Sequence, residues 1–127
     1  LLTPSSATKM KLINNLCLGS FMATLAECTA FAESCEIPKA KALEILGVGG
    51  GQSLVLKAKT QKLIDEDFSA HFSNNAINKD LHLLQDLAYN LKLPLYSACV
   101  PKELFSKMKM MGKGEEDFSS IYQLFKK

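Results

Sequence analysis

The sequence lacks any apolar run of the ~18–20 residues that a membrane-spanning helix needs, and it lacks clusters of one charge. Its 15 basic and 13 acidic residues are mixed along the chain and leave a net charge of +2. The lysine-rich piece 102–113 also carries Met108, Met110 and Met111, which is more typical of the exposed face of an amphipathic helix than of a binding patch. We therefore expect neither a membrane nor a nucleic acid as partner.

Metal-ligand and redox motifs are also missing. The four cysteines, Cys17, Cys28, Cys35 and Cys99, include no C-x-x-C pair and have no nearby histidine at ligand spacing. The first three fall near one face of a continuous helix, but its rise per residue separates them by ~16 Å and ~10 Å, so they cannot share a metal or pair within it. We expect no metal site, small buried thiols, and a reducing compartment: the cytoplasm, or alternatively an organelle matrix.

No familiar catalytic or nucleotide-binding grouping is visible in the residue order. His71 and His82 have no partner at catalytic spacing, and we expect both to be surface or structural residues. The glycine-rich stretch 47–53 is not a dinucleotide fingerprint, because Gln52 stands where the third glycine is required. A helix break followed by a turn is favoured there, although free N–H groups before the next helix could receive a carboxylate or phosphate.

Helical periodicity extends along the whole chain, and no segment alternates as a strand does. The 127 residues suit one domain, and we predict an all-α fold of about six helices around a long first helix. That helix begins at Thr3-Pro4, or after Ser5 or Ser6, and runs through Ser34. The others are expected at 38–46, 54–65, 76–91, 94–111 with a kink at Pro101, and after Glu115-Glu116-Asp117. The irregular segment 65–75 should cross the domain and place Phe68 or Phe72 inward.

Lys11 and Asn15 form the one suggestive polar pair. Residues four apart lie on one helical face, with Cβ atoms roughly 5–6 Å apart, so an ammonium and a carboxamide could converge on one small oxygen-bearing molecule. The same spacing also arises by chance, with a solvated lysine beside a polar neighbour as the alternative.

A family resemblance gives this pair a context. The segment Lys11-Leu12-Ile13-Asn14-Asn15, followed later by Lys79-Asp80-Leu81, resembles the C-terminal domain of the β-hydroxyacid dehydrogenases. This is the family of 3-hydroxyisobutyrate dehydrogenase and the related semialdehyde and glyoxylate reductases. The likeness spans nearly the whole chain and includes Asp67-Phe68, Phe72, the Pro94 region and Asp117-Phe118-Ser119.

The resemblance implies a fold like that of the C-terminal domain of 6-phosphogluconate dehydrogenase, in a homo-oligomer (a dimer or higher). It implies NAD or NADP, bound mainly by a Rossmann domain that this chain would lack, and a small hydroxyacid or semialdehyde substrate. Lys11 would donate the proton in carbonyl reduction and accept it in alcohol oxidation. Asn15 and Asn14 would hold the substrate. Phe72 and Lys79 would border the nicotinamide, with Asp80 as a neighbouring contact.

Two departures from the family pattern stand at the start of the chain. Ser5 and Ala7 occupy the glycine positions of G-x-G-x-x-x-K. The stretch 1–4 has neither an initiating Met nor a basic region, so we expect a cut within a longer chain. We expect the chain to be inactive alone, as the catalytic and dimerisation part of a dehydrogenase. The alternative is a non-catalytic helical dimerisation or protein-interaction module.

Overall fold

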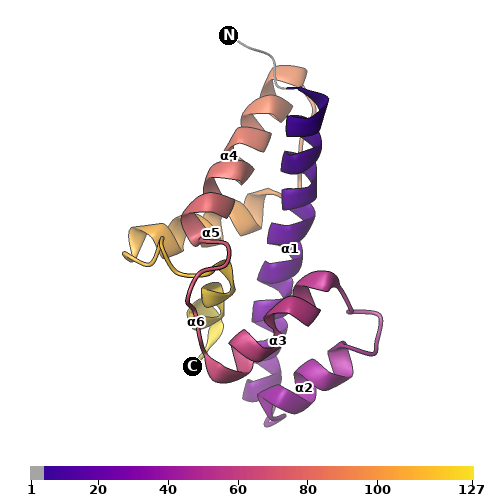
Figure 1. The fold of residues 1–127 in the computed structure, drawn as a ribbon, viewed down its shortest axis with the longest axis vertical. Helices are drawn as coiled ribbons and strands as arrows, with labels where there is room; N and C mark the ends of the chain where they lie inside the picture. The colour runs from indigo at the N-terminus through magenta and orange to yellow at the C-terminus, as the bar shows by residue number, and fades with distance from the viewer. Residues whose placement is uncertain (1–4) are drawn as a thin grey trace.

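The computed structural model describes residues 5–127, and over these residues it contains helices and no strand. The elements are α1 (Ser6–Ser34), α2 (Lys39–Leu46), α3 (Leu54–Asp65), α4 (Asn74–Leu91), α5 (Cys99–Met110), the 3₁₀ helix η1 (Phe118–Ile121) and α6 (Tyr122–Phe125). Helix α1 spans the long axis, with α4 beside its first half and α2 and α3 beside its second half (Figure 1). The predicted all-α fold around a long first helix is confirmed. None of the described helices is long and apolar enough to cross a membrane.

Serine caps define the starts of the three longest helices in the N-terminal two thirds. The hydroxyls of Ser5, Ser53 and Ser73 each accept a hydrogen bond from the backbone N–H three residues later, at 3.0–3.1 Å. Helix α2 begins directly after Pro38 and ends before Gly47, and α3 has the predicted bounds. The first-named start, Thr3-Pro4, lies outside the described residues, and the structure shows the predicted alternative, with Ser5 as the cap.

One predicted helix start near the C-terminus is wrong, and the closing helix, which begins after Asp117 as predicted, is of another type in its first half. Helix α5 begins at Cys99 and not at Pro94, so Pro101 lies in its first turn. A proline in the first turn breaks no intrahelical hydrogen bond, and no kink is needed there. The closing segment is a 3₁₀ helix followed by one turn of α-helix, and Asp117 caps it by accepting from the Ser119 N–H.

The hydrophobic core lies on one side of α1. Gly19 faces α4 so closely that an added Cβ would come within 3.3 Å of Ile77 Cδ1 and 3.4 Å of Leu81 Cδ1. Phe68 and Phe72 both pack against the core from the segment between α3 and α4, as predicted. The opposite side of α1 is uncovered, and its Phe31 side chain is 69% exposed. The other helices therefore pack against α1 but leave one of its faces exposed, although its apolar sequence suggested a central, fully covered position.

The cysteines differ from the prediction in one respect. All four are free thiols, but all four are exposed and not buried. Cys17 and Cys28 occupy exposed positions of α1, and Cys35 is its exposed C-cap residue.

Candidate functional site

A buried hydrogen bond joins the two family motifs across α1 and α4. The Asn15 Nδ2 donates to Asp80 Oδ2 at 2.6 Å, and both residues are less than a tenth exposed. Gly19, one turn further along α1, permits this close packing of the two helices. Asp80 therefore fixes the carboxamide of Asn15, whose remaining amide hydrogen and carbonyl oxygen keep their hydrogen-bonding capacity.

Lys11 lies one helical turn before Asn15. It is exposed, and its Nζ makes no hydrogen bond or ion pair with residues 5–127. Asn14 is also exposed, and Lys11, Asn14 and Leu18 occupy one side of α1 because they are three and four residues apart. That side leads toward α3.

Two adjoining hollows lie between α1 and α3. The first, about 370 Å³, is lined by Asn14, Cys17, Leu18, Phe21 and residues 52–55. The second, about 260 Å³, is lined by Leu18, Leu54, Val55, Ala58, Lys59, Phe72 and Phe118. They share Leu18, Leu54 and Val55, and we call the two together the α1/α3 trough. Its walls are mainly apolar, with Asn14 at one end and Phe72 at the other.

The remaining predicted site residues divide between this trough and another surface. Phe72 is half-buried, and its ring packs edge-on against Phe118 with the centroids 5.5 Å apart. Lys79 is exposed and borders a separate hollow beside α4, with His82 and Lys109. The structure thus groups Lys11, Asn14, Asn15, Phe72 and Asp80 around the first half of α1, and it places Lys79 apart from the trough.

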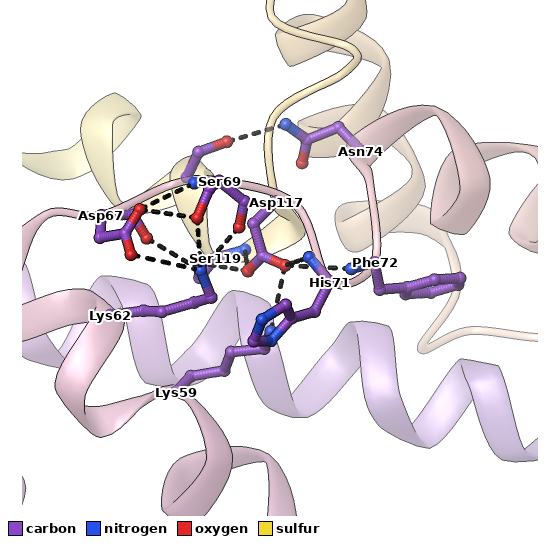
Figure 2. A network of polar contacts seen from close by, with 10 residues as sticks. Lys59, Lys62, Asp67, Ser69, His71, Phe72, Asn74, Asp117 and Ser119 are labelled. Carbon is purple, nitrogen blue, oxygen red and sulfur yellow. Dashed lines mark hydrogen bonds and ion pairs between the residues drawn. The ribbon is translucent and has the colours of Figure 1, made fainter.

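The residues that hold Phe72 were missed from the sequence. Asp117 is completely buried, and its Oδ1 accepts hydrogen bonds from Lys59 Nζ at 3.0 Å and from the backbone N–H groups of His71 and Phe72 at 3.0 and 3.1 Å. Its Oδ2 accepts from the N–H and hydroxyl of Ser119 at 3.1 and 2.5 Å. Figure 2 shows these donors converging on one carboxylate.

The carboxylate form of Asp117 is favoured by these contacts. Burial alone would raise the pKa of Asp117, but the hydrogen bonds from Ser119, Phe72, His71 and Lys59 outweigh it and hold the pKa below its usual value. One signal in the sequence pointed to this cluster. Lys59 follows Val55 and Leu56 at inward helical spacing, and a lysine on an apolar face requires an acidic partner. His71 contributes its backbone, consistent with the structural role expected of it.

No group of three or more metal-ligating side chains lies together in the part of the chain that the structure describes.

Comparisons with known proteins agree on one family. A family model described as NAD-binding of NADP-dependent 3-hydroxyisobutyrate dehydrogenase matches residues 5–125. The 2-(hydroxymethyl)glutarate dehydrogenase of Eubacterium barkeri is 32% identical over 117 residues, which are 91% of this chain and 39% of that protein. The cytokine-like nuclear factor N-PAC of Homo sapiens is 32% identical over 120 residues, which are 94% of this chain and 22% of that protein.

A solved structure shows the same helical arrangement. The crystal structure of 3-hydroxyisobutyrate dehydrogenase from Salmonella typhimurium superposes with a TM-score of 0.91 at 28% identity, over 97% of this chain and 43% of that one. The chain therefore spans less than half the length of each of these relatives.

Proposed function

This chain belongs to the family of NADP-dependent 3-hydroxyisobutyrate dehydrogenase, and on that premise we propose that it is the helical C-terminal domain of an oxidoreductase that interconverts a small hydroxyacid and its semialdehyde. The observation that carries the proposal is the position of Lys11. Its ammonium has no hydrogen-bonding or ionic partner among residues 5–127, and Lys11 lies one turn from Asn15, whose amide is fixed by the buried Asp80. The family supplies the reaction class, and these three residues supply the geometry.

The residue types suit the chemistry of carbonyl reduction. Hydride arriving at a carbonyl carbon leaves negative charge on the oxygen, and an ammonium can stabilise that charge and then give the oxygen a proton. Lys11 takes this role, and it takes the proton back when the alcohol is oxidised. Asn15 holds the substrate oxygen in a fixed direction because Asp80 restrains its rotamer. Asn14, at the rim of the trough, contacts the rest of the substrate.

The α1/α3 trough fits the flat, weakly polar edge of a nicotinamide ring, since its walls are mainly leucine, valine and phenylalanine. NAD or NADP would supply the hydride when bound, mainly through a dinucleotide-binding domain outside these residues. Phe72 borders the nicotinamide end. Asp80 and Lys79 are assigned to the cofactor by family position alone, and Lys79 borders a hollow that shares no residue with the trough. A homo-oligomer would cover the exposed apolar side of α1.

The test uses the complete open reading frame that contains these codons. Oxidation of NADH and NADPH is followed with a series of small semialdehydes, for the wild type and for Lys11→Ala. We expect kcat to fall by about 10²–10⁴-fold, the usual contribution of a positioned acid, with a small change in KM. Lys107→Ala, which removes an exposed lysine of α5, is the matched control and should keep wild-type rates. Residues 1–127 alone should show no turnover.

If Lys11→Ala kept the wild-type kcat, Lys11 would not be the acid. If residues 1–127 alone turned over substrate, a second domain would not be needed.

A second candidate is a non-catalytic helical module for dimerisation or protein interaction. It is favoured by the 32% identity to a protein named as a nuclear factor, and by Ser5 and Ala7 where the family pattern has glycine. A complete protein that forms oligomers but transfers no hydride to any semialdehyde or hydroxyacid tested would support this module.

A further inference from the structure

We propose that Asp117 and Lys59 are positioning residues for Phe72, and that they fix the aromatic end of the α1/α3 trough where the nicotinamide end of the cofactor would lie. This inference rests on the proposed function. Asp117, the cap residue of η1, bonds to Phe72 directly, whereas Lys59 of α3 acts through Asp117 and Phe118, and both charged residues are buried.

The first link acts on the backbone of Phe72. Asp117 Oδ1 accepts from its N–H at 3.1 Å, and the N–H of Phe118 donates to its carbonyl oxygen at 2.7 Å. A β-bridge between Ser73 and Asp117 continues this pairing. Both peptide groups of Phe72 are therefore attached to the 117–118 segment, so Phe72 moves only if that segment moves.

The second link acts on the ring. Lys59 Nζ lies 5.3 Å from the ring centroid of Phe118, and Phe118 packs edge-on against Phe72. Lys59 also lines the trough itself, beside Ala58 and Val55. A single ammonium thus touches both the carboxylate that holds the Phe72 backbone and the ring that holds its side chain.

Lys62 provides a matched comparison within the same helix. It is buried to the same extent as Lys59, and its Nζ bonds to Ser69 O at 2.6 Å and to Asp67 O at 3.3 Å. It therefore attaches the beginning of the same loop to α3, and its hydrogen bonds and ion pair are with Asp67 and Ser69 and not with Asp117 or Phe72. Losing Lys62 should loosen the fold without displacing the end of the trough.

The experiment compares Lys59→Met and Lys62→Met in the complete protein. We expect Lys59→Met to raise KM for the reduced cofactor about tenfold with kcat within about twofold, because a misplaced wall weakens binding in ground state and transition state alike. Lys62→Met should lower the melting temperature but leave KM within about twofold of the wild type. Lys59→Gln, which keeps an N–H donor, should give an intermediate KM and serves if Lys59→Met does not fold.

Amide hydrogen exchange on residues 1–127 separates this inference from the proposed function. Exchange at the Phe72 N–H should become at least about tenfold faster in Lys59→Met and stay unchanged in Lys62→Met, with or without enzymatic activity. An equal rise in KM for both variants, or unchanged exchange at Phe72 in Lys59→Met, would overturn the positioning role. A wild-type complete protein that transfers no hydride while Phe72 exchange responds as expected would overturn the proposed function alone.

Discussion

Asp117 shows how a buried charge is made tolerable in a small helical domain. Moving a carboxylate out of water costs several kcal/mol, and this is offset only when its oxygens are fully hydrogen-bonded and a cation lies nearby. Asp117 has two backbone donors on Oδ1, two donors from Ser119 on Oδ2, and the Lys59 ammonium. Removing one member leaves the others buried without a partner, so the cluster should behave as a unit.

The loss of stability at acidic pH should depend in part on Asp117. Its pKa is lowered in the folded state, so its contribution is present above the ordinary aspartate pKa and is lost as the pH falls through the folded value. We expect Asp117→Asn to be less stable than the wild type by about 2–4 kcal/mol near neutral pH, because Lys59 stays buried without its partner. The difference, measured by urea unfolding, should shrink as the pH falls below the ordinary aspartate pKa of 3.8 and Asp117 takes up its proton.

Part of the acid dependence should survive in Asp117→Asn, since the pKa of Glu66 is also lowered, mainly by its hydrogen bond from Lys126. Asp86→Asn, at an exposed site on α4, is the control and should follow the wild-type curve. Parallel curves for Asp117→Asn and the wild type would show that this carboxyl is not selectively stabilised in the fold.

The candidate site residues that lie close together in the sequence could be predicted from it. Lys11 and Asn15 stand four apart on one helix, and a motif of that kind is visible in any sequence. The sequence placed Asp117 before the closing helix and within the Asp117-Phe118-Ser119 part of the family resemblance, but it did not predict a buried carboxylate. Its partners Lys59 and Phe72 come from other parts of the chain, and no periodicity connects them to it. The burial that gives Asp117 its character exists only after folding.

At the scale of elements, the packing of α1 on α4 determines the geometry of Asn15 and Asp80. Gly19 allows the two helices to approach until the ends of Ile77 and Leu81 fill the space that a Cβ would occupy. Because Asn15 lies one turn away, the distance between the helices also sets the 2.6 Å hydrogen bond to Asp80. Helix separation and site geometry are therefore coupled.

Gly19→Leu should separate these two helices. Overpacking typically costs about 1–3 kcal/mol, which exceeds the gain of up to about 1 kcal/mol from replacing glycine within a helix. We expect a lower free energy of unfolding and, in the complete protein, a lower kcat/KM because Asp80 no longer restrains Asn15. Thr24→Leu, at an exposed position of the same helix, should preserve both quantities. Unfolding midpoints and rates that match between the two variants would contradict the coupling.

Helix boundaries were predictable where the terminating residue acts on its own neighbours. Pro38 and Gly47 flank α2 as predicted, and α3 has the predicted bounds, with Ser53 as its cap. Pro94 and Pro101 are equally suited to a first turn, so sequence alone cannot choose between them. Packing makes the choice, since Ala98 and Pro101 are buried while 91–94 and Tyr96 are exposed.

At the scale of the whole molecule, one face of α1 remains exposed along the helix, while α4, α2 and α3 pack beside the rest of it. This exposed face carries Met10, Phe21 and Phe31, each at least half exposed. The exposed thiols of Cys17 and Cys28 lie among them. Such a surface is unusual for a lone domain and favours association. The relatives are more than twice as long as this chain, so both a second copy and a second domain are candidates to cover it.

Self-association of residues 1–127 alone distinguishes a second copy from a second domain, because only a second copy can then cover the exposed face of α1. We expect sedimentation velocity to show dimers or larger species at about 200 µM that dissociate on dilution, since burial of apolar surface drives association. Phe31→Glu should shift the population toward monomer, because it buries a charge in the contact. Phe31 lies outside the α1/α3 trough, so the change does not disturb the proposed site.

Tyr89→Glu, at an 84% exposed position on α4, should leave association unchanged. A wild type that stays monomeric at the highest concentration would assign the uncovered side of α1 to a domain of the same polypeptide.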